Sequence, residues 1–467
     1  MKIQLIKARR TAFILTIFFI SFSNFKQIIP GEIFGEASYY FLFVFLGFEL
    51  LNIEKRNKLV FTKTIYNYEK FVFIIFCFIL ISFLFNLKGI FSNNYKQQLG
   101  ITRFIWQTII FILTFGVQVF FFFNFYKDFK INEIKTMFLK AINYSFNVIS
   151  FFGFFQYLSS YLKINLFVFI NWINLVPFFK IEPIEGISRM MVFSREPSFF
   201  ANYLIFIFPF LMLQLKEQQL FSNYFKVFFC VVLVFLSDSR IGLVILVFQG
   251  IFYLKENYRD HKKKILIIVK IFNKIILIFL AFVTLLFFTH KGTNKFITKK
   301  IERFNPMVKT SETTSNSTRY YSTAAGVKIG IENPVFGVGL GQVGFQICDK
   351  VSLKALKNNY ELRMFNCNCN QKIFPLAYNL FVRIFSELGI IGLSLFVFFF
   401  LFLFKIINQV RKKSKKSSEN EFVSAVFICF CSLFIFSLQI DTFRYISLWL
   451  IVSLILYLNE YDFKTIN

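Results

Sequence analysis

The sequence predicts an all-α integral membrane protein with about 12 transmembrane helices and one large extracytoplasmic loop. Apolar residues make up 56% of the 467 residues, charged residues only 17%, and phenylalanine occurs 76 times. A typical soluble domain carries about 25% charged residues and cannot bury so much apolar surface. The apolar residues gather in runs approaching the roughly 20 residues that cross a bilayer. These observations exclude an ordinary soluble domain.

The apolar runs define the predicted helices in order. We predict spans at residues 11–29, 37–53, 71–87, 104–126, 140–160, 199–215, 221–236, 241–254, 270–289, 386–404, 421–439 and 443–458.

The basic residues predict the orientation of these spans. The net charge of +28 would point to nucleic acid in a soluble protein. Here most of the basic residues lie in every second connection, which the positive-inside rule places in the cytoplasm. We therefore expect both termini to be cytoplasmic, with the bilayer rather than nucleic acid as the partner.

Two long connections, 161–198 and 290–385, then fall outside the cytoplasm. The chain divides into four predicted regions. They are an N-terminal region of five helices and the first outer loop (1–198), four core helices (199–289), the large outer loop (290–385) and three C-terminal helices (386–467).

Three cysteines lie in the large outer loop. An oxidising compartment favours a disulfide there, and Cys348 has two candidate partners, Cys367 and Cys369. The pattern Cys-Asn-Cys is not zinc spacing, which usually leaves two to four residues between ligands. We expect either a disulfide or no bond between these cysteines, and no metal.

Three arginines outside the predicted helices stand in distinctive surroundings. Arg195 lies in Ser-Arg-Glu-Pro-Ser-Phe-Phe-Ala, Arg240 in Ser-Asp-Ser-Arg-Ile-Gly-Leu and Arg319 in Asn-Ser-Thr-Arg-Tyr. Each could simply flank a span. Their shared outer position, which the positive-inside rule disfavours, argues for a role in binding, and a guanidinium offers a planar fork of donors that suits phosphate oxygens. The three together favour an anionic, lipid-linked substrate.

The chain resembles the O-antigen polymerase and ligase superfamily over residues 190–400. The resemblance rests on these three motifs, on the glycine-rich segment 333–342 and on Glu387-Leu388-Gly389-Ile390-Ile391-Gly392. The resemblance implies a GT-C type glycosyltransferase of the bacterial inner membrane whose site faces the periplasm or exterior. It implies an undecaprenyl-pyrophosphate-linked glycan as donor and another as acceptor, no cofactor or metal, and a chain-length regulator as a further partner. By motif, Arg195, Arg240 and Arg319 would hold the leaving pyrophosphate, with Arg189 as an additional candidate.

One departure from the superfamily pattern bears on the reaction. Tyr378 stands before Asn379 where the ligase branch carries histidine, which favours a polymerase of lipid-linked repeat units. A ligase acting on lipid A core or protein, and a lipid-linked oligosaccharide flippase, are the alternatives. The missing histidine leaves the general base open: Glu196 is our first candidate and Asp238 the second. Glu196 could instead be a helix-start carboxylate, and Glu387 a cap of the following span.

Overall fold

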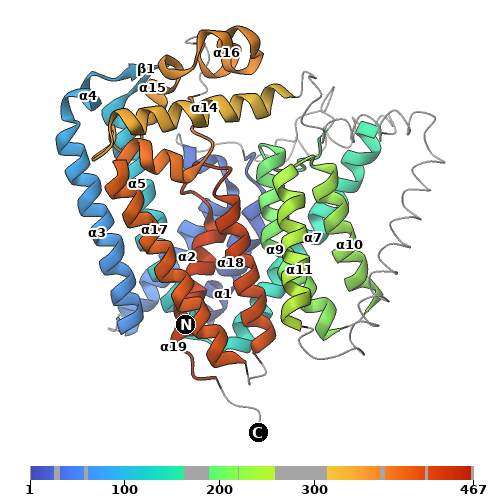
Figure 1. The fold of residues 1–467 in the computed structure, drawn as a ribbon. Helices are drawn as coiled ribbons and strands as arrows, with labels where there is room; N and C mark the ends of the chain where they lie inside the picture. Colours follow the sequence, from blue (N-terminus) through green and yellow to red (C-terminus); the bar gives the residue numbers. More distant parts are fainter. Residues whose placement is uncertain are drawn as a thin grey trace.

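The computed structural model shows a bundle of long helices closed at one end by shorter ones (Figure 1). It describes residues 2–25, 32–56, 61–161, 189–218, 220–257, 313–368, 374–415 and 419–463. The predicted all-α membrane fold is confirmed at this level, because every long described element is a helix and five helical segments are long and apolar enough to cross a membrane.

The bundle is built from the following elements: α1 (Lys2–Phe18), η1 (Phe19–Ser21), η2 (Glu32–Gly35), α2 (Ala37–Arg56), α3 (Lys63–Phe85), α5 (Gly100–Phe111), η3 (Ile112–Gln118), α6 (Val119–Lys127), α7 (Ile131–Tyr161), α9 (Pro197–Glu217), α10 (Phe221–Leu236), α11 (Arg240–Asn257), α17 (Leu380–Ser414), α18 (Asn420–Phe436) and α19 (Ile446–Glu460). A second group lies at one end of it: α4 (Leu87–Ser92), the antiparallel pair β1 (Asn94–Tyr95) and β2 (Gln98–Leu99), α14 (Thr313–Glu332), α15 (Val343–Lys350), α16 (Leu353–Asn358) and η4 (Leu362–Asn366). We call residues 313–368 the cap.

Helices occupy the predicted spans in whole or in part, except 270–289, which lies outside the described residues. Among the described residues, five helical segments are long and apolar enough to cross a membrane, and four further apolar helices are shorter. The five are Ala37–Glu54, Lys63–Phe85, Gly100–Lys127, Pro197–Glu217 and Leu380–Ser414. The total of twelve spans therefore stays a prediction.

The first helix differs from the prediction of a span at 11–29. It begins at Lys2 and ends at Phe18. The basic residues that precede the predicted span lie inside this helix. Arg9 is fully buried, and its guanidinium contacts the carboxylates of Glu49 and Asp128, each at 2.6 Å. A charge paired in this way is tolerated within a helix bundle.

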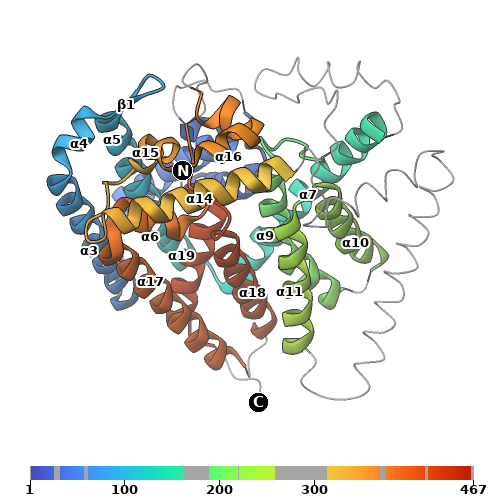
Figure 2. The same ribbon diagram turned by 45° about the horizontal axis from the view of Figure 1, so that its top comes forward.

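The two ends of the bundle carry different connections. The end that holds the C-terminus in Figure 1 gathers the predicted cytoplasmic connections, and ion pairs such as Arg10–Glu133 and Lys216–Glu421 join them. The cap lies at the opposite end, and Figure 2 shows α14 crossing over the bundle there. Residues from both predicted outer connections therefore share one end of the molecule.

Two glycine motifs fasten the cap to the bundle. The helix α17 is interrupted at Gly389, which has a φ of 66°, and a Cβ on it would lie 2.3 Å from the carbonyl oxygen of Val335. Opposite it, a Cβ on Gly337 would lie 2.3 Å from the carbonyl carbon of Glu387. The backbone N–H of Gly339 donates to the oxygen of Glu387 at 2.8 Å. These glycines allow two backbones to pair closely, so the cap cannot shift independently of α17.

Glu387 does not cap the start of the helix as we had interpreted it. Its side chain is 2% exposed and lies inside α17, one turn after Arg383, whose Nε donates to its carboxylate at 3.1 Å. The helix already begins at Leu380, and its first N–H groups are capped by the side chain of Asn379. Asn379, rather than Glu387, ends the loop and starts the helix.

Candidate functional site

Segments from four parts of the chain meet between the cap and the bundle. They contribute Arg189 and Glu196 from the approach to α9, Arg319 from α14, Glu361 from the turn between α16 and η4, and Tyr378 from the approach to α17. The guanidinium carbon of Arg319 lies 5.6 Å from the centre of the Tyr378 ring, within cation–π distance. We call these five residues the Arg319 cluster.

Glu361 is held in this cluster by a hydroxyl of the neighbouring helix. The Thr318 Oγ1 lies 3.2 Å from the Glu361 carboxylate and 3.1 Å from the side-chain oxygen of Asn359. Burial raises the pKa of Glu361 above the usual range of a glutamate, whereas the Thr318 hydroxyl and the charge of Arg319 lower it. Glu196 raises it and Arg189 lowers it more weakly. The Glu361 carboxyl thus binds a proton more readily than an exposed one.

Tyr378 stands in a strained backbone conformation that an acidic side chain supports. Its φ is 54°, a value that favours glycine. The Asp441 carboxylate accepts hydrogen bonds from the backbone N–H groups of Ala377 at 2.6 Å and Tyr378 at 3.2 Å. Asp441 is 6% exposed, and its backbone oxygen accepts from the Arg383 guanidinium at 2.5 Å. This network fixes the direction in which the Tyr378 ring leaves the loop.

Burial and the carboxylates of Glu361 and Glu196 raise the pKa of the Tyr378 hydroxyl, while Asn366 and Arg319 lower it. The net shift is upward, so the phenol keeps its proton at neutral pH. Tyr378 can donate a hydrogen bond to an anionic group but cannot act as a base, unlike the histidine that it replaces in the motif.

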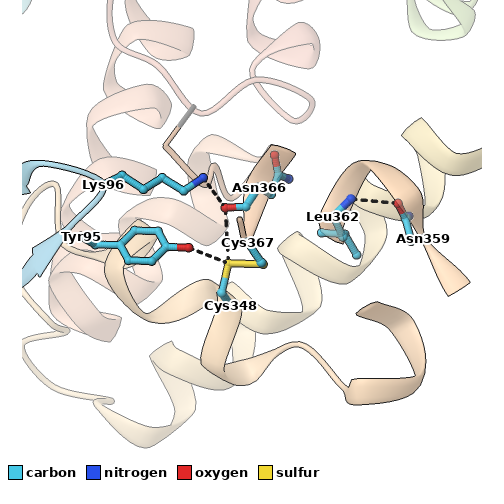
Figure 3. The surroundings of a disulfide bond; sticks show 7 residues. All are labelled: Tyr95, Lys96, Cys348, Asn359, Leu362, Asn366 and Cys367. Carbon is cyan, nitrogen blue, oxygen red and sulfur yellow. Dashed lines mark hydrogen bonds between the residues drawn. A yellow bond between two sulfur atoms is a disulfide. The ribbon is translucent and has the colours of Figure 1, made fainter. Parts of the chain in front are cut away.

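A disulfide holds the part of the cap that carries Glu361 (Figure 3). Cys348 of α15 bonds to Cys367, one of the two partners that the sequence left open, and Cys369 lies outside the described residues. The Lys96 ammonium donates to the backbone oxygen of Asn366 at 2.7 Å. On the other side of η4, the N–H of Leu362 donates to the Asn359 side chain at 3.0 Å. The turn with Glu361 is thereby tied at both ends.

The remaining predicted residues lie at the same end of the bundle. Arg195 and Glu196 are exposed and immediately precede α9, where the Glu196 carboxylate accepts from the Ser198 hydroxyl at 3.1 Å. Arg240 is the first residue of α11, and Asp238, with a φ of 54°, stands in the turn before it.

The predicted residues are thus only partly assembled. Arg189, Glu196 and Arg319 come together in the cluster, while Arg195, Arg240 and Asp238 occupy the turns at the starts of α9 and α11. Over the described ranges, no three His, Cys, Asp or Glu side chains are placed to hold a metal ion.

The comparison with protein families decides the relationship. Residues 225–397 match the family model described as O-antigen ligase. The match covers less than half of the chain, and it supports the resemblance to the O-antigen polymerase and ligase superfamily. The match runs from α10 into α17 and contains Arg240, Arg319, Glu361 and Tyr378, whereas the segment with Arg189, Arg195 and Glu196 precedes it. No curated protein matches the chain. Similarity to this family implies an integral membrane enzyme that transfers glycans from lipid-linked substrates, and it does not support the flippase alternative.

Sequence reasoning missed Glu361 and Asp441. Glu361 follows Asn-Asn-Tyr in a polar stretch without a motif, and Asp441 is a single acid between the last two helices. The sequence does not reveal either residue, because its neighbours lie far along the chain. Glu361 belongs to the Arg319 cluster, and Asp441 binds the backbone of Tyr378, another member of it.

Proposed function

We propose that the protein polymerises lipid-linked oligosaccharide repeat units at the extracytoplasmic face of the bacterial inner membrane, as a GT-C type glycosyltransferase. The donor is a glycan on undecaprenyl pyrophosphate, and the acceptor is a second lipid-linked unit. The observation that carries this proposal is the Arg319 cluster, which gathers two guanidinium groups beside carboxylates where the cap meets the bundle. The bundle below would take the lipid tail, and the space beside the cap would take the sugars.

The arginines have a direct role in this chemistry. As the bond between the anomeric carbon and the pyrophosphate breaks, negative charge grows on the leaving group, and fixed positive charge stabilises it. Arg319 and Arg189 supply such charge from the cluster, and Arg195 and Arg240 supply it from the adjoining turns. Arginine charge serves here in place of a metal, so we expect glycan transfer to persist in excess chelator. Glu196 and Asp238 are the candidates for the general base that the sequence motifs offer.

The choice of polymerase over ligase rests on Tyr378. A tyrosine phenol keeps its proton at neutral pH even at its ordinary pKa, and burial raises that pKa further, so Tyr378 does not accept a proton as a histidine can. The ligase remains the second candidate, because the matching family model is described as O-antigen ligase. A chain-length regulator is a further proposed partner of the polymerase.

Deletion of the gene separates the two candidates. Loss of a polymerase leaves single repeats on the cell surface, whereas loss of a ligase leaves long polymer on the lipid carrier. Complementation with Arg195→Ala, Arg240→Ala, Arg319→Ala or Glu196→Gln then tests the site, read as the glycan ladder on a gel. An unchanged ladder in the deletion strain would contradict the proposal, and a full ladder from all four variants would contradict the site.

The orientation has its own test. We propose that the C-terminal end of α17 and the N-terminal end of α18, both at the end of the bundle opposite the cap, face the cytoplasm. A reporter inserted after Lys415 should be active only in the cytoplasm, and one inserted in the exposed part of α16 only outside it. The reverse pattern would overturn the assignment of the cap to the extracytoplasmic face.

A further inference from the structure

Glu361 is a titratable group of the cluster that the sequence motifs leave without a role. It stands between α16 and η4, and α16 lies beyond α14 in Figure 1. The groups that face it come from each segment packed around it: Thr318 and Arg319 on α14, Arg189 and Glu196 before α9, and Tyr378 before α17. Thr318 is in hydrogen-bond contact with the Glu361 carboxylate, and the other groups act on it through their charge or polarity.

The contacts of Thr318 satisfy Glu361 in both protonation states. A hydroxyl has one hydrogen to donate and can also accept. When Glu361 is ionised, the Thr318 hydroxyl donates to its carboxylate across 3.2 Å. When Glu361 is protonated, its O–H can donate to Thr318 Oγ1, whose own hydrogen turns to the Asn359 oxygen at 3.1 Å. A rotation of one hydroxyl therefore serves a carboxyl that gains and loses a proton during turnover.

The balance of charges around Glu361 suits the same task. Burial raises the pKa of Glu361 above the usual range of a glutamate, whereas the Thr318 hydroxyl and the charges of Arg319 and Arg189 lower it. A general base works best when its pKa lies near the pH at which the enzyme operates. Glu196, by contrast, is exposed, begins a helix and already accepts a hydrogen bond from Ser198.

The cap is the part of the molecule that would lie on the sugar side of the proposed substrate, and Glu361 belongs to the cap. A lipid tail must lie along the bundle, so the pyrophosphate comes next, level with the arginines at the helix ends. The glycan then extends towards the cap, where α14 and α16 follow one another in Figure 1. A base for an acceptor hydroxyl is needed on this outer side.

We propose that Glu361 is the general base of the transfer; this inference rests on the proposed function. The acceptor hydroxyl oxygen bonds to the anomeric carbon of the donor, and the bond from that carbon to the pyrophosphate oxygen breaks. Its electron pair leaves with the lipid pyrophosphate, beside Arg319. The hydroxyl proton passes to the Glu361 carboxylate and then to solvent.

The test uses the purified full chain in nanodiscs with undecaprenyl-pyrophosphate-linked repeat units. Glu361→Gln preserves shape and removes the basic oxygen, so kcat should fall by about 10²-fold or more, the usual contribution of a general base. The KM for the donor should change little, because the arginines are intact. Glu361→Asp should retain part of the activity. The matched control is Glu332→Gln, which alters an exposed carboxylate of the cap that pairs with Lys350.

A second variant gives a signature that a structural role would not produce. Thr318→Val removes the hydroxyl that lowers the Glu361 pKa, so that pKa should rise. Because the base must be ionised, activity increases with pH through this pKa. The acidic limb of the pH profile should therefore move to higher pH in Thr318→Val, with activity recovered on the alkaline side.

Three outcomes overturn the proposal: Glu361→Gln with wild-type kcat, a pH limb unmoved in Thr318→Val, or a 10²-fold loss in Glu196→Gln alone. These results differ from failure of the proposed function, in which the wild-type protein itself would transfer no glycan. An unchanged thermal unfolding midpoint shows that Glu361→Gln is folded. If the midpoint falls but each folded molecule keeps the wild-type kcat, the proposal that Glu361 is the general base is also contradicted.

Discussion

The buried pair of Arg383 and Glu387 in α17 gives a sharp test of the architecture. The Arg383 guanidinium donates to the Glu387 carboxylate at 3.1 Å, to the backbone oxygen of Asp441 at 2.5 Å and to the Gln107 side chain at 2.8 Å. It also lies 5.2 Å from the centre of the Phe443 ring. Replacing Arg383 by methionine keeps the volume and removes all three donors.

The size of the effect follows from burial. The side chains of Arg383 and Glu387 are 7% and 2% exposed, so the remaining carboxylate would have little access to water. Breaking a buried ion pair by removing one partner costs about 3–5 kcal/mol, because an uncompensated charge stays behind. The two carbonyl oxygens that lose a donor add to this cost. Removing both charges should be milder, since apolar replacement of a whole buried pair is often close to neutral.

The assay is thermal unfolding in detergent, followed as loss of monodisperse protein. Arg383→Met should lower the midpoint strongly, and Arg383→Met combined with Glu387→Met should recover part of the loss. Lys405→Met is the matched control, because Lys405 is an exposed cation of the same helix and its loss should have little effect. Equal midpoints for wild type and Arg383→Met, or a double variant less stable than the single one, would refute the reasoning.

Three further predictions follow from other contacts. Gly389→Ala should lower the unfolding midpoint by the equivalent of about 1–3 kcal/mol, because the positive φ and a backbone oxygen 2.3 Å from the new Cβ force strain. The control is Gly250→Ala in α11, which has no atom within 4 Å of the new Cβ and should be neutral or stabilising. A larger loss of stability in Gly250→Ala than in Gly389→Ala would contradict this. Asp441→Ala removes the acceptor of two backbone N–H groups before α17 and should reduce glycan transfer more than donor binding; equal retention of both would argue against a positioning role. Cys348→Ser should destabilise the protein by about 2–4 kcal/mol and leave Cys367 reactive to maleimide, whereas maleimide labelling of Cys367 in the unreduced wild-type protein would show that the disulfide is absent.

The sequence predicted most of the helices because apolar runs and their basic flanks are local signals. It misplaced α1 because Arg9 reads as a flank until Glu49 and Asp128, from two other parts of the chain, are seen to bury it. Similarly, the glycine-rich segment 333–342 and Gly389 stand in the sequence only as parts of two motifs. Their reason is the close pairing of Gly337 and Gly389 backbones, which only the fold reveals.

In the candidate site, too, local sequence motifs can be recognised, whereas contacts between distant segments cannot. Arg319 was found because its motif is continuous in sequence, and the superfamily match includes it. Glu361 and Asp441 carry no motif; each matters because of a neighbour far along the chain, Thr318 for the first and Tyr378 for the second. Their roles depend on distances between segments, and a single sequence does not contain those distances.

The most direct test of the central claim is glycan transfer by the purified protein, measured as the mass of the lipid-linked products. Wild-type protein in nanodiscs with a single lipid-linked repeat unit should form products that are longer by whole repeats. Arg319→Ala should form almost none, because the cluster loses its charge on the leaving pyrophosphate. Undiminished chain growth in Arg319→Ala would contradict the account.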